Sequence, residues 1–254
     1  MLEPSNPSSF SRIRHFSLHI APFHHVTLNN LSTPALLIEQ SRLRDNLAAM
    51  QETADANDVT LRPHVKTHKS AAIAKRQQQR GAEGLTVATV KEAETFVEAG
   101  FSDVRVAYPV TGRDKHERLQ ALRDEATISF TVDTAAGAEQ ASAVYAEAGA
   151  PVDVLMEVDV GHGRCGVHWS DDEAAVTLAR HVASLPGLRL AGLLTHAGQA
   201  YHGPSGNETE NEALRRVAQH ERDRMLSVAS VLSDADVPGA TPDAFEISVG
   251  STPT

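Results

Sequence analysis

The sequence contains a single cysteine, Cys165, in 254 residues, so an internal disulfide is excluded. A chain without disulfides is typical of a reducing compartment, and we expect a cytoplasmic protein. As a nucleophile Cys165 is a weak candidate, and a small packing residue is the simpler interpretation.

Positive charge is also scarce. The chain has 33 acidic against 23 basic residues and a formal net charge of −10. Without a dominant basic patch, neither nucleic acid nor an anionic membrane is an expected partner. No apolar run approaches the roughly 20 residues of a membrane-spanning helix. The N-terminus lacks the continuous apolar core of a signal peptide.

The first 31 residues have no lasting hydrophobic periodicity and are rich in Ser, Pro, His and Asn. They predict a poorly ordered arm at 1–31, followed by one domain at 32–254. No cysteine or nearby carboxylate completes a recognised ligand set in the arm, so no metal site is predicted there. The arm's histidines, which alone do not predict such a site, are His15, His19, His24 and His25.

From residue 33 onward, strand and helix patterns alternate. A short apolar strand is predicted at Thr33–Glu39, and further strands begin near residues 59, 84, 103, 127, 151, 188 and 245. Helices are predicted between them, and capping boxes pair Thr89 with Glu92 and Ser170 with Glu173. This rhythm predicts an α/β fold with a parallel sheet. We expect a TIM-type (βα) barrel, incomplete at the C-terminus, because a full barrel has eight strands.

Basic side chains gather at the end of the predicted strand 59–66. On a strand, Arg62, His64, Lys66 and His68 would share one face. Burial and mutual repulsion would lower the pKa of a lysine there, as Schiff-base chemistry requires. Lys69 would lie on the opposite face, so Lys66 is the preferred amine. The alternative is a polar strand end in solvent.

Catalytic groups of a barrel lie at the C-terminal ends of its strands. The polar residues at the predicted strand ends are Lys66, His68, Thr89, Tyr108, Asp133, residues 159–164, Thr195, His196 and residues 250–252. Their convergence would place a lysine, an arginine and histidines around one mouth.

The run Gly161–Gly166 matches the dinucleotide fingerprint G-x-G-x-x-G. That fingerprint needs a helix opening inside the glycine run, whereas the next predicted helix starts at Ser170, and no acidic residue ends the following strand. The glycines more simply allow a sharp turn that points Arg164 inward. The alternative for Arg164 is a salt bridge to a nearby carboxylate.

Three further candidates follow the last two strands. His196 could pack on a planar cofactor or be a structural histidine, and Tyr201, in the long loop 197–206, could bind a ligand or be a surface aromatic. Residues Gly250, Ser251 and Thr252 are suited to an anion cradle, and the alternative is an ordinary turn.

Four segments carry a resemblance to a known family. They are Arg62–Lys69, Gly161–Gly166, Thr195–Gly198 and Ser248–Pro253. The chain resembles the fold-type III pyridoxal-phosphate enzymes, the alanine racemase superfamily, and within it the D-threonine aldolases and D-serine dehydratases.

The resemblance implies a role for each matching residue. Lys66 would form the internal aldimine with pyridoxal phosphate, with His64 among the cofactor-binding residues. Arg164 would contact the phenolic oxygen, His196 would lie against the pyridine ring and Tyr201 would meet the pyridine nitrogen. The phosphate would be held by Gly250, Ser251 and Thr252.

The implied activity is that of a lyase acting on a small D-amino acid, by aldol cleavage or dehydration. An amino-acid racemase on the same scaffold and a truncated cofactor-binding barrel without activity are the alternatives. Members of the family continue with an eighth strand and a C-terminal β-domain, which carries a divalent-cation site in the aldolase and dehydratase group. We expect these parts to be missing here, which leaves open both a homodimer and activity of the chain alone.

Overall fold

The structure is a computed structural model that describes residues 31–251. The arm predicted at 1–31, apart from its last residue, and its four histidines lie outside the described residues. The chain divides into a short unit that ends at Leu43 and a large unit that begins at Arg44. Helix α1 (Gln40–Ala56) begins in the short unit and continues into the large one.

The strand predicted at Thr33–Glu39 is not formed. These residues have no regular secondary structure, and Leu36 is 91% exposed. A strand is stable only where a neighbouring strand satisfies its backbone N–H and C=O groups, and no described segment pairs with this one. An apolar run alone was therefore not enough to predict a strand.

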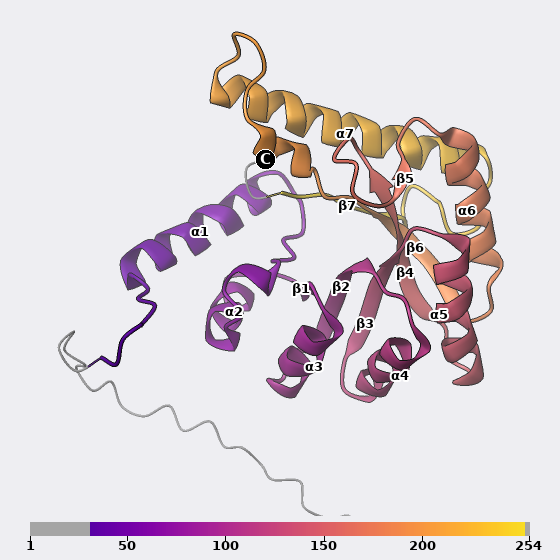
Figure 1. The fold of residues 1–254 in the computed structure, drawn as a ribbon, viewed down its shortest axis with the longest axis horizontal. Coiled ribbons are helices and arrows are strands. Elements are labelled where there is room, and N and C mark those ends of the chain that lie inside the picture. The colour runs from indigo at the N-terminus through magenta and orange to yellow at the C-terminus, as the bar shows by residue number, and fades with distance from the viewer. Residues whose placement is uncertain (1–30, 252–254) are drawn as a thin grey trace, which may run out of the picture. The chain divides into compact units, whose positions relative to one another are not determined.

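The large unit is built on a parallel sheet with the order β1-β2-β3-β4-β6-β7 (Figure 1). The strands are β1 (Leu85–Val87), β2 (Asp103–Pro109), β3 (Thr127–Val132), β4 (Val152–Asp159), β6 (Leu188–Leu194) and β7 (Glu246–Ser248). A two-residue strand that the sequence did not predict, β5 (Val167–His168), pairs with β4. The other six strands confirm the predicted alternation.

Helices connect the strands and cover the sheet. They are α2 (Ala71–Gln78), α3 (Val90–Glu98), α4 (Arg113–Ala121), α5 (Ala135–Glu147), α6 (Asp172–Ser184) and α7 (Glu210–Asp234). The Thr89 cap is confirmed, since its hydroxyl accepts the Glu92 N–H at 3.1 Å. The Ser170 cap was wrong: α6 is capped by Asp171, which accepts the Ala174 N–H at 3.0 Å. Within residues 31–251, no helix is long and apolar enough to cross a membrane.

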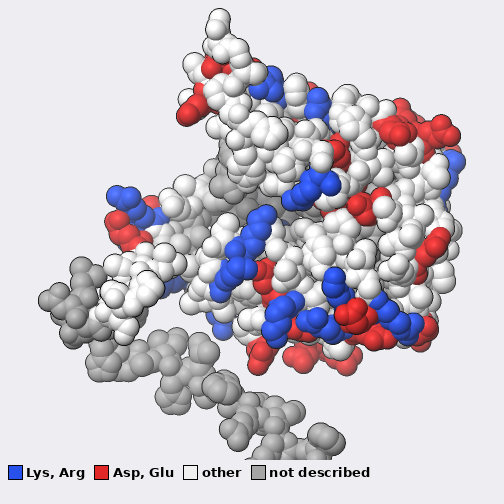
Figure 2. Space-filling view, in the orientation of Figure 1, with Lys and Arg blue, Asp and Glu red and all other residues white. Residues whose placement is uncertain are grey.

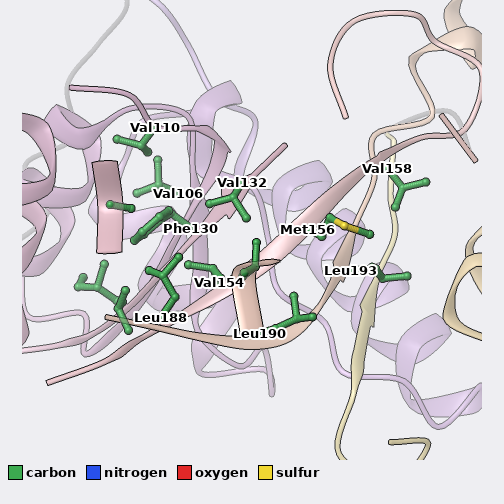
Figure 3. Close-up of a cluster of buried hydrophobic side chains, with 14 of the residues drawn as sticks. Val106, Val110, Phe130, Val132, Val154, Met156, Val158, Leu188, Leu190 and Leu193 are labelled. Atoms are coloured by element: carbon green, nitrogen blue, oxygen red, sulfur yellow. The ribbon is translucent and has the colours of Figure 1, made fainter. Parts of the chain in front are cut away.

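The core lies between the sheet and these helices. On one face of the sheet, Val106 pairs in register with Phe130, Phe130 with Val154, and Val154 with Leu190. All four are buried, and Figure 3 shows them in one cluster. Burying a side chain of this size stabilises the fold by about 1.5–3 kcal/mol.

The opposite face of the sheet carries polar residues and shows that the sheet curls. Arg105, on β2, donates to Glu246 on β7 with an Nη2–Oε2 distance of 2.8 Å, and its Nε donates to Ser129 at 3.0 Å. β2 and β7 lie near opposite ends of the strand order. Only a sheet curled about its concave face brings them together, so the fold is the predicted TIM-type barrel in the form of a parallel half-barrel.

Candidate active site

Lys66 lies in a turn rather than in a strand, which corrects the predicted arrangement. A single bridge between His64 and Thr86 stands where the strand 59–66 was expected, and a short 3-10 helix, η2 (Val65–Thr67), follows it. His64 ends the extended segment because its Nδ1 accepts the Lys66 N–H at 3.3 Å. The four basic residues therefore do not share one strand face.

The other basic residues of this segment have separate partners. Arg62 makes a two-pronged ion pair with Asp103, with both N–O distances 2.8 Å. The Nδ1 atom of His68 accepts the Ser70 N–H at 3.1 Å. Lys69 binds Glu92 of α3. Neither Arg62 nor Lys69 is available as a free base, and the preference for Lys66 over Lys69 stands on this difference.

The Lys66 amine makes no hydrogen bond or ion pair within the described part of the chain. Its pKa is lowered by partial burial and then by the positive charge of Arg164, while Glu92 acts in the opposite direction. A lysine with a lowered pKa is more often neutral and nucleophilic. The direction agrees with the one expected for Lys66, but burial and Arg164 are its causes rather than a row of strand neighbours.

Two histidines beside Lys66 are neutral at physiological pH. Burial, followed by the charge of Lys66, lowers the pKa of His64 to about 4. The pKa of His196 is lowered by burial, and the charges of Arg164 and Lys66 add to this effect. Lys66 is thus within electrostatic range of His64, Arg164 and His196, although these groups come from the segment before β1 and from the loops after β4 and β6.

The loop after β4 carries Arg164 and is held against its own strand. Asp159 accepts the N–H groups of Gly161 and His162 at 2.8 Å and of Gly163 at 3.0 Å. Gly166 has a φ of +97° and packs so closely on the β4 backbone that a side chain would overlap it. The glycines thus serve a sharp turn, as predicted, and α6 begins only at Asp172, unlike a dinucleotide-binding helix.

A buried carboxylate that the sequence analysis missed anchors this loop. Glu157, 2% exposed, accepts from Arg164 Nη2 at 3.3 Å, Cys165 Sγ at 2.9 Å and Thr131 Oγ1 at 3.0 Å. Burial and the bond to Glu157 raise the pKa of the Cys165 thiol to about 11. Arg164 therefore makes the salt bridge considered as its alternative and still acts on Lys66. Cys165 is a hydrogen-bond donor rather than a packing residue.

His196 follows β6 and links two segments of the site. Its Nδ1 lies 3.2 Å from the carbonyl oxygen of Gly250. A carbonyl only accepts, so Nδ1 carries the proton of the neutral ring and Nε2 is left as an acceptor. The rings of His162 and Tyr201 lie 5.6 and 5.9 Å from that of His196, measured between centroids.

His162 lies in the predicted strand-end segment 159–164, but the sequence did not indicate a role for it. Its Nδ1 is buried and has no partner among the described residues. Gly198 makes room for the ring, because a methyl group at that position would overlap it. The close contact between Gly198 and the His162 ring depends on a loop conformation that the local sequence does not predict. Tyr201 lies on the short helix η4 (Gly198–His202) and is 57% exposed.

The loop after β7 differs from an open anion cradle. The Gly250 N–H donates to Glu221 of α7 at 3.0 Å, so this donor is already used. Ser251 has partners as well. Thr252 lies outside the described residues. The phosphate role of this loop stays a prediction.

Three other predicted strand-end residues, Thr89, Thr195 and Asp133, make their contacts elsewhere in the described chain. Thr89 caps α3, and Thr195 donates to the Val158 carbonyl at 2.7 Å. Asp133 lines a separate open groove of about 730 Å³ with Asp171 and His181. Between residues 31 and 251, no three His, Cys, Asp or Glu side chains are grouped so that they could hold a metal ion.

Comparison with known proteins identifies the family to which the chain belongs. The model of the alanine racemase N-terminal domain matches residues 38–239. The chain is 40% identical to D-threonine aldolase of Arthrobacter sp over 210 residues, and this match covers 83% of this chain and 54% of the aldolase. It is 38% identical over 228 residues to D-threo-3-hydroxyaspartate dehydratase of Delftia sp., covering 90% and 57%.

A solved structure agrees with these matches. A substituted form of D-threo-3-hydroxyaspartate dehydratase, in the metal-free form, superposes with a TM-score of 0.81 at 37% identity, covering 90% of this chain and 57% of that one. The chain thus spans little more than half the length of these relatives. With the family model matched over most of its residues and the half-barrel in common, the chain belongs to the alanine racemase N-terminal domain family of the fold-type III pyridoxal-phosphate enzymes.

Proposed function

We propose that this chain is the cofactor-binding barrel of a pyridoxal-phosphate-dependent lyase that acts on a small D-amino acid through Lys66. The observation that carries the proposal is the unpaired Lys66 amine, whose pKa is lowered by burial and by Arg164. It lies at the end of the sheet where barrel enzymes place their catalytic groups.

The residues present fit the cofactor. Pyridoxal phosphate carries an aldehyde, a phenolic oxygen and a phosphate, so its site needs an unpaired amine and cationic side chains with N–H donors to spare. The Lys66 amine has no partner in the described chain, and Arg164 uses one N–H group of its five in a contact of 3.3 Å to Glu157. The buried Nδ1 of the partly exposed His162, which has no partner among the described residues, adds an unused polar atom beside His196.

Each residue has a separate task in this proposal. Lys66 holds the aldehyde end, and Arg164 donates to an anionic oxygen. His196 stays neutral because its pKa is lowered by burial, so its ring can pack on an aromatic plane without the cost of burying a charge. Tyr201, whose ring lies 5.9 Å from that of His196, is proposed to contact the pyridine nitrogen. Residues 250–252 are proposed to contact the phosphate, with the donor of Gly250 shared with Glu221.

When bound, pyridoxal phosphate serves as an electron sink for cleavage of a bond at Cα or Cβ of an amino acid. The relatives are a D-threonine aldolase and a D-threo-3-hydroxyaspartate dehydratase. Both of those substrates carry a hydroxyl group on Cβ. We therefore propose a β-hydroxy D-amino acid as the substrate, with aldol cleavage or loss of water as the reaction.

The proposal includes the setting of the protein. The family's divalent-cation site is expected outside this chain, in the part of the relatives that it does not match. A cytoplasmic location is supported by the lone cysteine, and a homodimer stays open. On the face shown in Figure 2, basic and acidic side chains are interspersed, so no large area of positive charge favours nucleic acid.

The test begins with the purified chain and pyridoxal phosphate, followed by borohydride reduction and peptide mapping. We expect reduced cofactor on Lys66, loss of the label in Lys66→Ala, and no loss in Lys75→Ala, a control at an exposed lysine of α2. Release of aldehyde or ammonia from β-hydroxy D-amino acids then separates the two reactions. A folded chain without label on Lys66 would refute the proposal, and racemisation of alanine without either product would favour the racemase alternative.

A further inference from the structure

Two lysines lie three residues apart at the site, and only one of them is paired. Lys69 Nζ binds Oε1 of Glu92, on the first turn of α3. The other oxygen of Glu92, Oε2, accepts the Ala88 N–H at 2.7 Å. Both carboxylate oxygens are therefore engaged, and the Glu92 side chain is only 12% exposed.

Glu92 is also the carboxylate whose charge acts on Lys66. The charged and titratable groups that interact electrostatically with the Lys66 amine are Arg164 from the loop after β4, His196 after β6, His64 of its own segment and Glu92 of α3. Among them Glu92 alone attracts a proton to Lys66. A flexible lysine side chain next to a free carboxylate would pair with it, and the amine would then stay protonated.

We propose that Lys69 is a positioning residue that occupies Glu92 and so keeps the amine of Lys66 unpaired. The inference rests on the proposed function of Lys66. It goes further, because it assigns a task to the second lysine of the motif Lys66-Thr67-His68-Lys69, which the proposed reaction does not use.

The backbone supports a dedicated role for Lys69. Its φ of +47° lies in the left-handed region, which is unfavourable for a lysine. The Lys69 N–H donates to the Val65 carbonyl at 2.8 Å and so closes the turn that carries Lys66. Strain of this kind persists only where the surroundings hold it, and here the Glu92 contact holds the side chain.

This backbone conformation also determines which substitutions of Lys69 are suitable for a test. Asparagine tolerates the left-handed region, so Lys69→Asn removes the charge and keeps the turn. Lys69→Gly is a second variant with the same tolerance. Lys69→Arg keeps a cation for Glu92 and is the matched control. Glu92→Gln removes the carboxylate charge, and it is combined with Lys69→Asn in a double variant.

The readout is the pKa of the Lys66 amine in the full chain without cofactor. Competitive acetylation with acetic anhydride between pH 6 and 11 forms an amide on each neutral amine and releases acetate and a proton. Peptide mass spectrometry gives the midpoint for each lysine. We expect Lys69→Asn and Lys69→Gly to raise the Lys66 midpoint by about one pH unit, which is about tenfold less reactive amine below it. Lys69→Arg should leave it unchanged.

The double variant separates charge control from a purely structural role. If Lys69 acts by occupying Glu92, Lys69→Asn with Glu92→Gln returns the Lys66 midpoint to the wild-type value or below it. An unchanged midpoint in Lys69→Asn and Lys69→Gly, or an equal rise in the single and the double variant, would overturn the inference. Borohydride trapping on Lys66 in the unsubstituted chain tests the proposed function separately, because it does not depend on Lys69.

Discussion

Replacing His64 by asparagine should make the fold less sensitive to acid between pH 7 and pH 5. In the folded chain the pKa of His64 is lowered from 6.5 to about 4 by burial and by Lys66. An unfolded chain has an ordinary histidine. Between these two values the unfolded state binds the proton and the folded state does not, so acid favours unfolding.

The magnitude follows from the size of the shift. A depressed pKa leaves stability intact above pH 6.5 and removes it as the pH falls from 6.5 toward 4. One unit corresponds to 1.36 kcal/mol, so His64 alone costs the wild-type chain up to about 2 kcal/mol of stability between pH 7 and pH 5. Because His64 is half-buried, about 1–2 kcal/mol is the expected range.

Asparagine is the matched replacement because its side-chain oxygen can accept the Lys66 N–H that His64 Nδ1 accepts now. Urea unfolding followed by circular dichroism at pH 7, 6 and 5 gives the free energy of unfolding for both chains. The lowered pKa values of His68 and His116 add acid sensitivity to both chains and cancel in the difference, whereas His196, which interacts with His64, contributes a smaller coupled effect. If His64→Asn loses as much stability as the wild type between pH 7 and pH 5, the burial of His64 has been misjudged.

Two further predictions concern buried contacts of the same barrel. Glu246→Gln leaves the guanidinium of Arg105, which is 4% exposed, without its countercharge. We expect the free energy of unfolding, measured with urea at pH 7, to fall by about 1–3 kcal/mol, a range reduced because Glu246 is 45% exposed. Glu147→Gln, in the exposed pair Arg113–Glu147, is the control and should have no measurable effect. Cys165, whose thiol pKa is raised to about 11, should react slowly with iodoacetamide at pH 8. Glu157→Gln should accelerate the reaction, because it removes one of the causes that raise this pKa. Equal reaction rates in the two chains would contradict the Glu157 contact.

The order of elements could be predicted because its signals are local. Apolar runs such as Val152–Met156, the Thr89 cap and the turn at Gly161–Gly166 each act within about ten residues, and the structure has all three. The position of the candidate site followed from the same signals, because parallel strands bring their carboxyl ends to one edge of the sheet.

The geometry around Lys66 could not be predicted in this way. The alternating residues from Arg62 to His68 have the pattern of a strand, but Pro63 has no N–H to give to a ladder and His64 binds the Lys66 N–H. These two local effects end the extended segment after a single bridge. The sequence correctly indicated a cluster of basic residues at this place, but their side chains do not point to one face as a strand would require.

Long-range partners are the other part that sequence reasoning missed. Arg105 and Glu246 are separated by 141 residues, and no property of either segment indicates the other. The buried Glu157 looked like one more residue of an apolar strand, yet it binds Arg164, Cys165 and Thr131. Such contacts depend on how the sheet curls, which is a property of the whole barrel.

The same contacts explain how a site on loops can be held in place. Each functional group has its own anchor on a neighbouring element: Glu157 for Arg164, the Gly250 carbonyl for His196, and the Lys69–Glu92 pair for the turn of Lys66. The groups themselves are coupled, however, because the charge of Arg164 lowers the pKa values of both Lys66 and His196. A substitution at Glu157 that displaces Arg164 should therefore also raise the pKa of Lys66, and its effect should not simply add to that of a substitution at another anchor.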